Sequence, residues 1–126
     1  MRYAKKSLFK AVVDVVKGVN PKWIDEGLKY PKIDLHSWIE NTPTTKEQEI
    51  REISFIVEGY SNKSYSEAVD MADEIATKLC NEPLSIDGFE VVSIIPDGTE
   101  EIEEQDNNNV VIYRQLNRLL ATIKTR

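Results

Sequence analysis

The chain has few of the residues that most enzymes use at their active sites. Its 126 residues contain one histidine, His36, and one cysteine, Cys80. A single cysteine excludes a disulfide within the chain and a cysteine-based metal cluster. The five glycines lie singly, so no glycine-rich loop could cradle a phosphate group. We therefore expect a protein that is not an enzyme and that needs no cofactor or metal.

Basic charge and long apolar runs are also scarce. The chain has 16 Lys and Arg against 22 Asp and Glu, a formal net charge of −6. Duplex binding draws much of its affinity from cations that neutralise phosphates, and no basic face is evident here. The longest apolar run is far short of the ~20 residues that span a bilayer. Lys5 and Lys6 are not followed by a leucine-rich segment, so we expect neither a membrane span nor a secretion signal.

The hydrophobic periodicity predicts an α+β domain that covers residues 1–126. Apolar residues recur at helical spacing in two segments and alternate in three others. The spacing predicts helices over 3–18 and 64–81 and strands over 32–40, 50–60 and 89–95. The first two strands should pair as an antiparallel hairpin. The expected fold is an antiparallel sheet of about four strands with two main helices packed on one face.

Several local details follow from the same patterns. Ser64 and Glu67 form a capping box, in which each side chain accepts the other's backbone amide. The strand over 89–95 is almost continuously apolar, which favours a central position in the sheet. Residues 114–124 fit either a strand or a helix. We favour a strand for at least the first half of 110–123, because the preceding strand would otherwise form an open edge.

Two polar groups in the sequence could carry chemistry. Asp34 and His36 lie two residues apart on a predicted strand, with Trp38 on the same side and Ile33, Leu35 and Ile39 on the other. Such a pair could serve as two metal ligands or as a base and its orienting acid. No spacing suggests a third ligand, so a solvated strand face is the default interpretation. A hydrolase or nuclease that uses Asp34, His36 and loop carboxylates with a divalent metal is an alternative, and it predicts that the substitution His36→Ala abolishes metal binding.

The second group is a run of acids over residues 97–109. It lacks the alternating ligands and tight glycine turn of a calcium loop. We expect an extended, solvated loop, which could line a channel that DNA passes without binding, because repeated negative charge repels phosphate. The candidate interface or channel-lining residues in this run are Asp97, Glu100, Glu101, Glu103, Glu104 and Asp106.

Exposed aromatic residues suggest a surface that contacts other proteins. Trp23, Trp38, Tyr30 and Tyr60 fall in predicted loops or on the outer strand face. Aromatic side chains are enriched at the centres of protein interfaces. Partial burial explains each of them equally well. A surface with Trp23 and Trp38 leaves a second function open, that of a small adaptor protein that binds a cellular partner.

The order of the elements resembles the tail terminator, or tail-completion, proteins of long-tailed bacteriophages. The similarity rests on ISFIVEGYSNKSYSEAVDMADEI from Ile53 to Ile75, with YPKI at 30–33 and VIYR at 111–114, and it extends over about residues 3–124. This chain departs from the family in its two long polar loops and its less strictly alternating C-terminal segment. Head-completion, neck and tail-tube proteins share parts of the same outline.

The resemblance implies a structural role in a virion. Tail terminators form a hexameric ring on the last ring of the tail tube, stop its growth and present the surface that joins the head. The implied partners are further copies of the chain in a homo-hexamer, the tail-tube protein, a head-completion or neck protein, and DNA that passes through the channel without specific binding. The implied location is the tail or neck of a virion that is assembled in the host cytoplasm.

Overall fold

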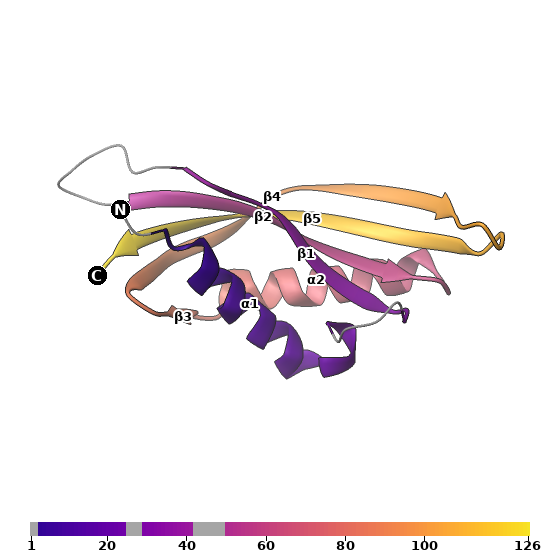
Figure 1. Cartoon of the computed structure of the whole chain (residues 1–126), viewed down its shortest axis with the longest axis horizontal. Helices are drawn as coiled ribbons and strands as arrows, with labels where there is room; N and C mark the ends of the chain where they lie inside the picture. Colours follow the sequence, from indigo (N-terminus) through magenta and orange to yellow (C-terminus); the bar gives the residue numbers. More distant parts are fainter. Residues whose placement is uncertain (1–2, 25–28, 42–49) are drawn as a thin grey trace.

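The computed structural model describes residues 3–24, 29–41 and 50–126 of the chain. Two helices and five strands make up the fold, together with a short 3₁₀ helix. In chain order these are α1 (Lys5–Val19), η1 (Pro21–Trp23), β1 (Lys32–Glu40), β2 (Ile50–Ser61), α2 (Tyr65–Asn81), β3 (Ser85–Ile86), β4 (Phe89–Gln105) and β5 (Val111–Thr125) (Figure 1). No helix in these ranges is both long and apolar enough to cross a membrane.

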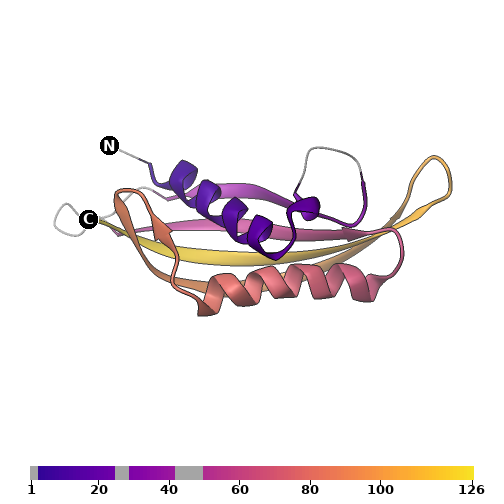
Figure 2. The same ribbon diagram turned by 90° about the horizontal axis from the view of Figure 1, so that it is seen from below.

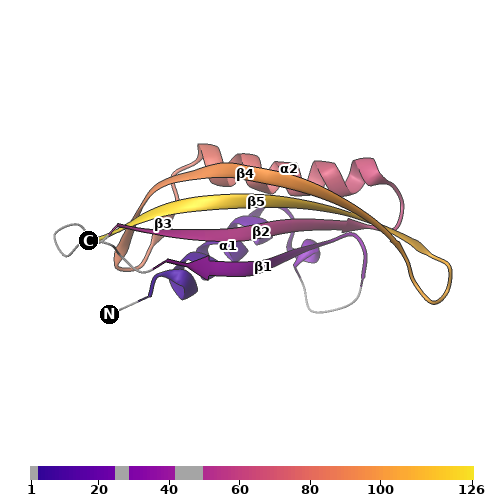
Figure 3. The ribbon, with the colours of Figure 1, turned by 90° about the horizontal axis from the view of Figure 1, so that it is seen from above.

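The five strands form one antiparallel sheet in the order β1-β2-β5-β4-β3. Both helices pack on the same face, and the described residues place no helix on the opposite face (Figures 2 and 3). The α+β class and the helices on one face are thereby confirmed. The sheet has five strands and not about four, because the two-residue strand β3 pairs with the start of β4.

The core lies between this sheet and the two helices. Alternate residues of β2 and β5 face the helices and are buried there, among them Phe55, Val57, Leu119 and Ala121. Helix α2 passes very close to β2 at Gly59, where an added Cβ would lie 2.5 Å from the carbonyl oxygen of Ala68. The missing side chain at Gly59 is what allows the helix to approach the strand so closely.

Each helix begins with a bond network that reaches back to the sheet. The carboxylate of Glu40 in β1 accepts the backbone N–H of Ala4 at 2.9 Å and of Lys5 at 2.8 Å, and it also accepts the guanidinium of Arg51 at 3.0 Å. The Glu40 carboxylate therefore caps the N-terminus of α1, because the N-cap residue itself, Ala4, has no side chain that could accept a hydrogen bond. A negative group at this end also suits the helix dipole.

The capping box predicted for α2 forms only by half. Ser64 Oγ accepts the N–H of Glu67 at 3.1 Å, as expected. The Glu67 carboxylate does not return to the Ser64 amide and instead accepts the hydroxyl of Ser61 at 2.6 Å. Ser61 Oγ in turn accepts the amides of Lys63 at 3.0 Å and Ser64 at 3.3 Å. Ser61, the last residue of β2, therefore accepts the Ser64 amide in place of Glu67.

The predicted faces of β1 are wrong beyond His36. The register with β2 shifts between His36 and Ile39, and Ser37 has a φ of 60°. This bulge turns Trp38 toward the helices, where its ring stacks on Phe55 with centroids 4.4 Å apart. Ile39 is turned to the other face and is 55% exposed. One extra residue in a strand reverses the alternation of every side chain that follows.

The C-terminal third also differs from the expectation. Residues 97–105, expected in a solvated loop, continue β4, and residues 114–124 belong entirely to strand β5. Segment 89–95 was expected at the centre of the sheet, but strand β5 takes that position, between β2 and β4. The strand continues through the acids because its side chains stay in water on both faces, where sheet formation does not bury their charge.

Candidate functional site: an open sheet face and an acidic hairpin

The face of the sheet without helices is called the open face here. Its side chains come from alternate positions of the strands, which lie side by side in Figure 3. Ile56 and Leu116 are largely buried at its centre, whereas Ile39 and Ile95 are exposed. The open face therefore combines a packed apolar middle with exposed apolar residues nearer the edges.

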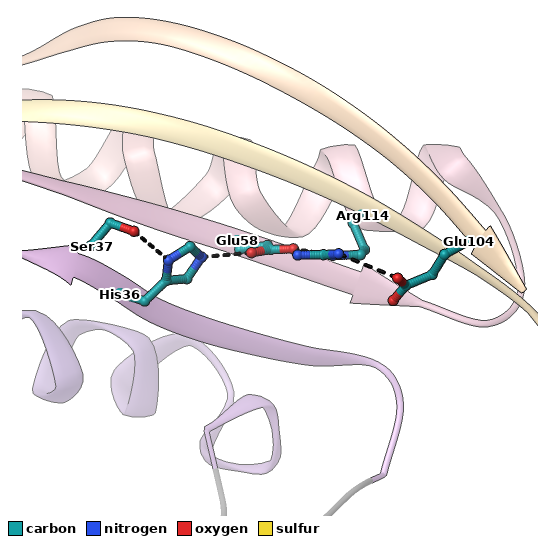
Figure 4. A network of polar contacts seen from close by, with 5 residues as sticks. All are labelled: His36, Ser37, Glu58, Glu104 and Arg114. Carbon is teal, nitrogen blue, oxygen red and sulfur yellow. Dashed lines mark hydrogen bonds and ion pairs between the residues drawn. The ribbon is translucent and has the colours of Figure 1, made fainter. Parts of the chain in front are cut away.

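A row of charged side chains crosses the open face from strand to strand (Figure 4). His36 Nε2 in β1 lies 2.6 Å from Glu58 Oε1 in β2. Arg114 Nε in β5 donates to Glu58 Oε2, and Arg114 Nη1 lies 3.4 Å from Glu104 Oε2 in β4. The Ser37 hydroxyl, at the bulge, lies 2.8 Å from His36 Nδ1. Four neighbouring strands are thus tied together by side chains as well as by their backbones.

Glu58 is the centre of this row. Its side chain is completely buried, yet both carboxylate oxygens have partners. A buried carboxylate is costly unless it is paired, so Arg114 and His36 are what make Glu58 tolerable there. Conversely, the bond to Glu58 raises the pKa of Arg114, while partial burial acts in the opposite direction. We conclude that Arg114 stays charged and that the row is fixed.

The tyrosine beside the row responds to the same charges. Burial and, after it, the charge of Glu58 raise the pKa of Tyr60 to about 12, while Arg114 opposes the shift. The Tyr60 ring also lies under two cations, with Lys32 Nζ 4.6 Å and the Arg114 guanidinium carbon 5.2 Å from its centroid. Tyr60 is therefore held as a neutral phenol that packs against positive charge.

The row is better suited to holding strands together than to catalysis. Asp34 does share the open face with His36, as predicted, but the two ring nitrogens of His36 contact Ser37 and Glu58. Glu58 is too deeply buried to reach a substrate. Within residues 3–24, 29–41 and 50–126, no group of three or more His, Cys, Asp and Glu side chains is placed to hold a metal ion.

The acidic residues form the second feature, a long hairpin of β4 and β5 that extends beyond the helices (Figure 2). From the register, Glu100 and Glu104 share the open face with Arg114, and Glu101 and Glu103 lie on the other face. Asp97 sits where the register of β4 shifts, between Pro96 and Thr99.

The tip of this hairpin is ordered by its own acid. Asp106 Oδ1 accepts the N–H of Asn108 at 2.8 Å and of Val110 at 2.9 Å. Asn109 has a φ of 63°, a left-handed conformation that asparagine tolerates well. The acids are therefore carried by a hydrogen-bonded hairpin, and this structure brings them together on one arm of the molecule.

The two tryptophans lie away from the hairpin. Trp23 and Trp38 are both partly buried and pack against the core on the helix side of the sheet. The Phe9 ring of α1 meets Trp38 edge-on, with centroids 5.6 Å apart. The predicted outer-face position of Trp38 is therefore wrong, and the two groups of candidate residues do not form one site.

The residues that sequence reasoning missed are Glu58 and Arg114. A signal was present, since Glu58 directly follows three consecutive apolar residues of β2, Phe55, Ile56 and Val57. A charge inside a strongly apolar strand predicts a partner on a neighbouring strand. Its identity could not be read without the register of β2 with β5, which places Glu58 opposite Leu116 and Tyr60 opposite Arg114.

Comparisons with known proteins identify the fold. No family model matches the chain, and no curated protein matches it. Among solved structures, a chain from the virion of a native gene transfer agent particle is similar, with a TM-score of 0.76. The alignment covers 98% of this chain and 99% of that chain at 12% sequence identity. The two chains therefore share one fold over essentially their whole lengths.

Proposed function

We propose that the chain is a structural protein of a phage-like virion, of the tail terminator type. In this role several copies form a ring that ends the tail tube and joins it to the head or neck. The observation that carries the proposal is the similarity of the whole fold to a chain of the gene transfer agent virion. The sequence resemblance around Ile53–Ile75 points the same way.

The geometry of the chain supports an assembly role. Subunits of a ring need rigid surfaces, since each contact must be repeated without error around an axis. The charged row through Glu58 holds four strands in a fixed arrangement, and the acidic hairpin is hydrogen-bonded along its length. Both features create defined surfaces, and neither requires a bound cofactor.

The net charge also agrees with a protein past which DNA moves. In a ring, each copy would contribute the acids Asp97, Glu100, Glu101, Glu103, Glu104 and Asp106 from its hairpin. Facing the channel, they would repel phosphate and keep DNA from adhering to the wall. Facing outward, they would instead attract a basic neighbouring ring. The first arrangement predicts no measurable DNA affinity for the assembled ring.

The experiment that tests the proposal measures mass and then position. Light scattering and native mass spectrometry over a wide concentration range should reveal a closed ring, about 86 kDa for six copies of the 14.4-kDa chain. Particles with the tagged chain should then show the tag at the end of the tail tube. A tag along the tube would favour a tube protein, and a tag inside the head opening would favour a head-completion protein. A monomer that never labels a particle would refute the proposal.

Charge reversal separates the hairpin from the fold. Changing Glu100, Glu101, Glu103 and Glu104 together to lysine should leave folding intact, since these side chains are exposed. The variant should nevertheless assemble fewer infectious or DNA-containing particles. A matched control reverses exposed acids elsewhere, for example Asp14 and Glu74 on the helices. Full particle yield from the hairpin variant would show that the acids serve only solubility.

The adaptor alternative loses its main support. It rested on a surface formed by Trp23 and Trp38, but Trp38 lies between the rings of Phe9 and Phe55. The hydrolase alternative required more ligands near His36, and the described residues supply no such cluster. Unchanged metal affinity in a His36→Ala variant would remove it altogether.

A further inference from the structure

One side of strand β4 lacks a strand partner over most of its length. Strand β3 pairs only with the first two residues, through Ser85 with Glu90 and Ile86 with Phe89. Beyond them, from Val91 to Gln105, the described residues provide no strand on that side. A free edge offers a row of backbone donors and acceptors to any extended chain.

A groove runs beside this free edge, between β4 and helix α2. A cavity of about 480 Å³ is lined by Ala76 and Thr77 of the helix and by Ile94 and Thr99 of β4. A second cavity of about 200 Å³ adjoins it and reaches Val92. The edge therefore has space for side chains next to its backbone groups.

Exposed apolar residues mark the same edge. Val92 is 55% exposed and Ile95 is 50% exposed, although they belong to the segment that reads as a buried strand. Side chains of this size lose contact with water when a strand is added beside them, which favours the addition. The edge is thus both unpaired and apolar along its first half.

The second half of the edge sets the charge of what can bind. The acids at 97, 100, 101, 103, 104 and 106 line this half, while Arg114 is engaged by Glu58 and Glu104. Arg118 is the exposed cation near the groove. The balance is strongly negative, and an acidic strand would be repelled while a basic strand would be attracted.

We propose that the free edge of β4 binds an extended, basic segment of another protein by strand addition. The segment would hydrogen-bond to the regular stretch of β4 from Thr99 to Gln105, beyond its register shifts and Pro96, and set Lys or Arg opposite the acids there. Its continuation past Val92 and Ile95 would place small apolar side chains in the groove beside α2. In this mode the backbone bonds provide affinity and the alternate side chains provide specificity. The site belongs to the strand edge itself, so it does not depend on the chain being a tail terminator.

A second copy of this chain is a poorer occupant. The other free edge of the sheet is β1, whose exposed or partly exposed charges include Asp34 as well as Lys32. That edge carries charges of both signs and is therefore not basic.

The test uses the full chain and a synthetic peptide of alternating lysine and valine as the probe. We expect saturable binding by fluorescence anisotropy, together with slower amide hydrogen exchange concentrated in β4 from Thr99 to Gln105. The same peptide with alternate amides methylated keeps its charge but loses half of its hydrogen bonds, and it should bind at least about tenfold more weakly. A glutamate–valine peptide should not bind.

A pair of variants locates the site. Thr77→Arg places a bulky cation in the groove at an exposed helix position and should weaken the lysine–valine peptide about tenfold. Ser66→Arg adds the same charge to an exposed position near the start of the same helix and should change affinity much less. Circular dichroism would confirm that both variants are folded.

Three outcomes would overturn the proposal. Equal binding of the methylated peptide would mean that charge alone attracts the probe. Exchange protection on β1 would place the peptide at the wrong edge. Self-association of the chain that protects β4 without any peptide would assign the edge to a second copy.

Discussion

The substitution Glu58→Ala tests whether the charged row holds the sheet together. Glu58 is fully buried and pairs with both His36 and Arg114. Removing one member of a buried ion pair costs about 3–5 kcal/mol, because the remaining charge loses its partner. Here Arg114 is 21% exposed and keeps a contact to Glu104 at 3.4 Å, so part of that cost is recovered. We expect a loss of about 2–4 kcal/mol in the free energy of unfolding.

The assay is urea unfolding followed by circular dichroism, with the melting temperature as a second measure. A loss of this size should lower the melting temperature of a domain of this length by about 10 °C. Glu52→Ala is the matched control, since Glu52 lies on the same face of the same strand but is exposed. It should change stability by less than about 0.5 kcal/mol.

A milder substitution separates charge from shape. Glu58→Gln keeps an acceptor for Arg114 and should cost about 1–2 kcal/mol. It also removes the nearby charge that raises the pKa of Tyr60, so this phenol should titrate below about 12. If Glu58→Ala were no more damaging than Glu52→Ala, the row would contribute nothing to stability, and the reasoning from burial would be refuted.

Three further predictions follow from single contacts. Gly59→Ala should destabilise the protein by about 2–3 kcal/mol, since the new Cβ meets a helix carbonyl. Gly18→Ala should instead stabilise it slightly, because no atom lies within 4 Å of the new Cβ and alanine favours the helix. Urea unfolding measures both effects. Glu40→Ala should cost about 2–4 kcal/mol and loosen α1, which amide exchange of the first helical turn would detect. Burial raises the pKa of Tyr65 to about 12 as well, so in an alkaline titration followed by phenolate absorbance the component near pH 12 should lose about half of its amplitude in Tyr60→Phe. The raised pKa favours the neutral phenol in the folded state, so its contribution to stability is complete below pH ~10 and is lost as the pH rises toward 12.

The helices and most strands could be predicted because local signals agree with tertiary packing. The apolar stripe that includes Leu8, Val12 and Val16 is also the buried face of α1. Ser64 begins α2 as its N-cap. Alternation in β2 places Phe55 and Val57 in the core. In these elements a short window of sequence contains all the information that the fold uses.

The faces of β1 could not be predicted because a single residue decides them. Ser37 adopts a left-handed conformation that glycine or asparagine would have signalled, and serine gives no such warning. The stacking of Trp38 on Phe55 favours the bulge, and this contact joins two strands and a helix. The position of Trp38 therefore depends on contacts with residues that are distant in the sequence.

The acidic hairpin shows why charge is a poor guide to disorder in a long antiparallel pair. Same-face neighbours along a strand are about 7 Å apart, and in water the repulsion between two exposed charges at that distance is well under 1 kcal/mol. Pairing with β5 supplies backbone hydrogen bonds along the arm, and Arg114 offsets one of the acids. In a loop without regular structure, the distances between these acids would not be fixed. A hydrogen-bonded arm presents them at fixed spacing on two faces, and only the second arrangement can recognise a partner by geometry. If the arm acts in assembly, moving its acids by one residue should therefore be as damaging as removing them, although the net charge of the chain would stay the same.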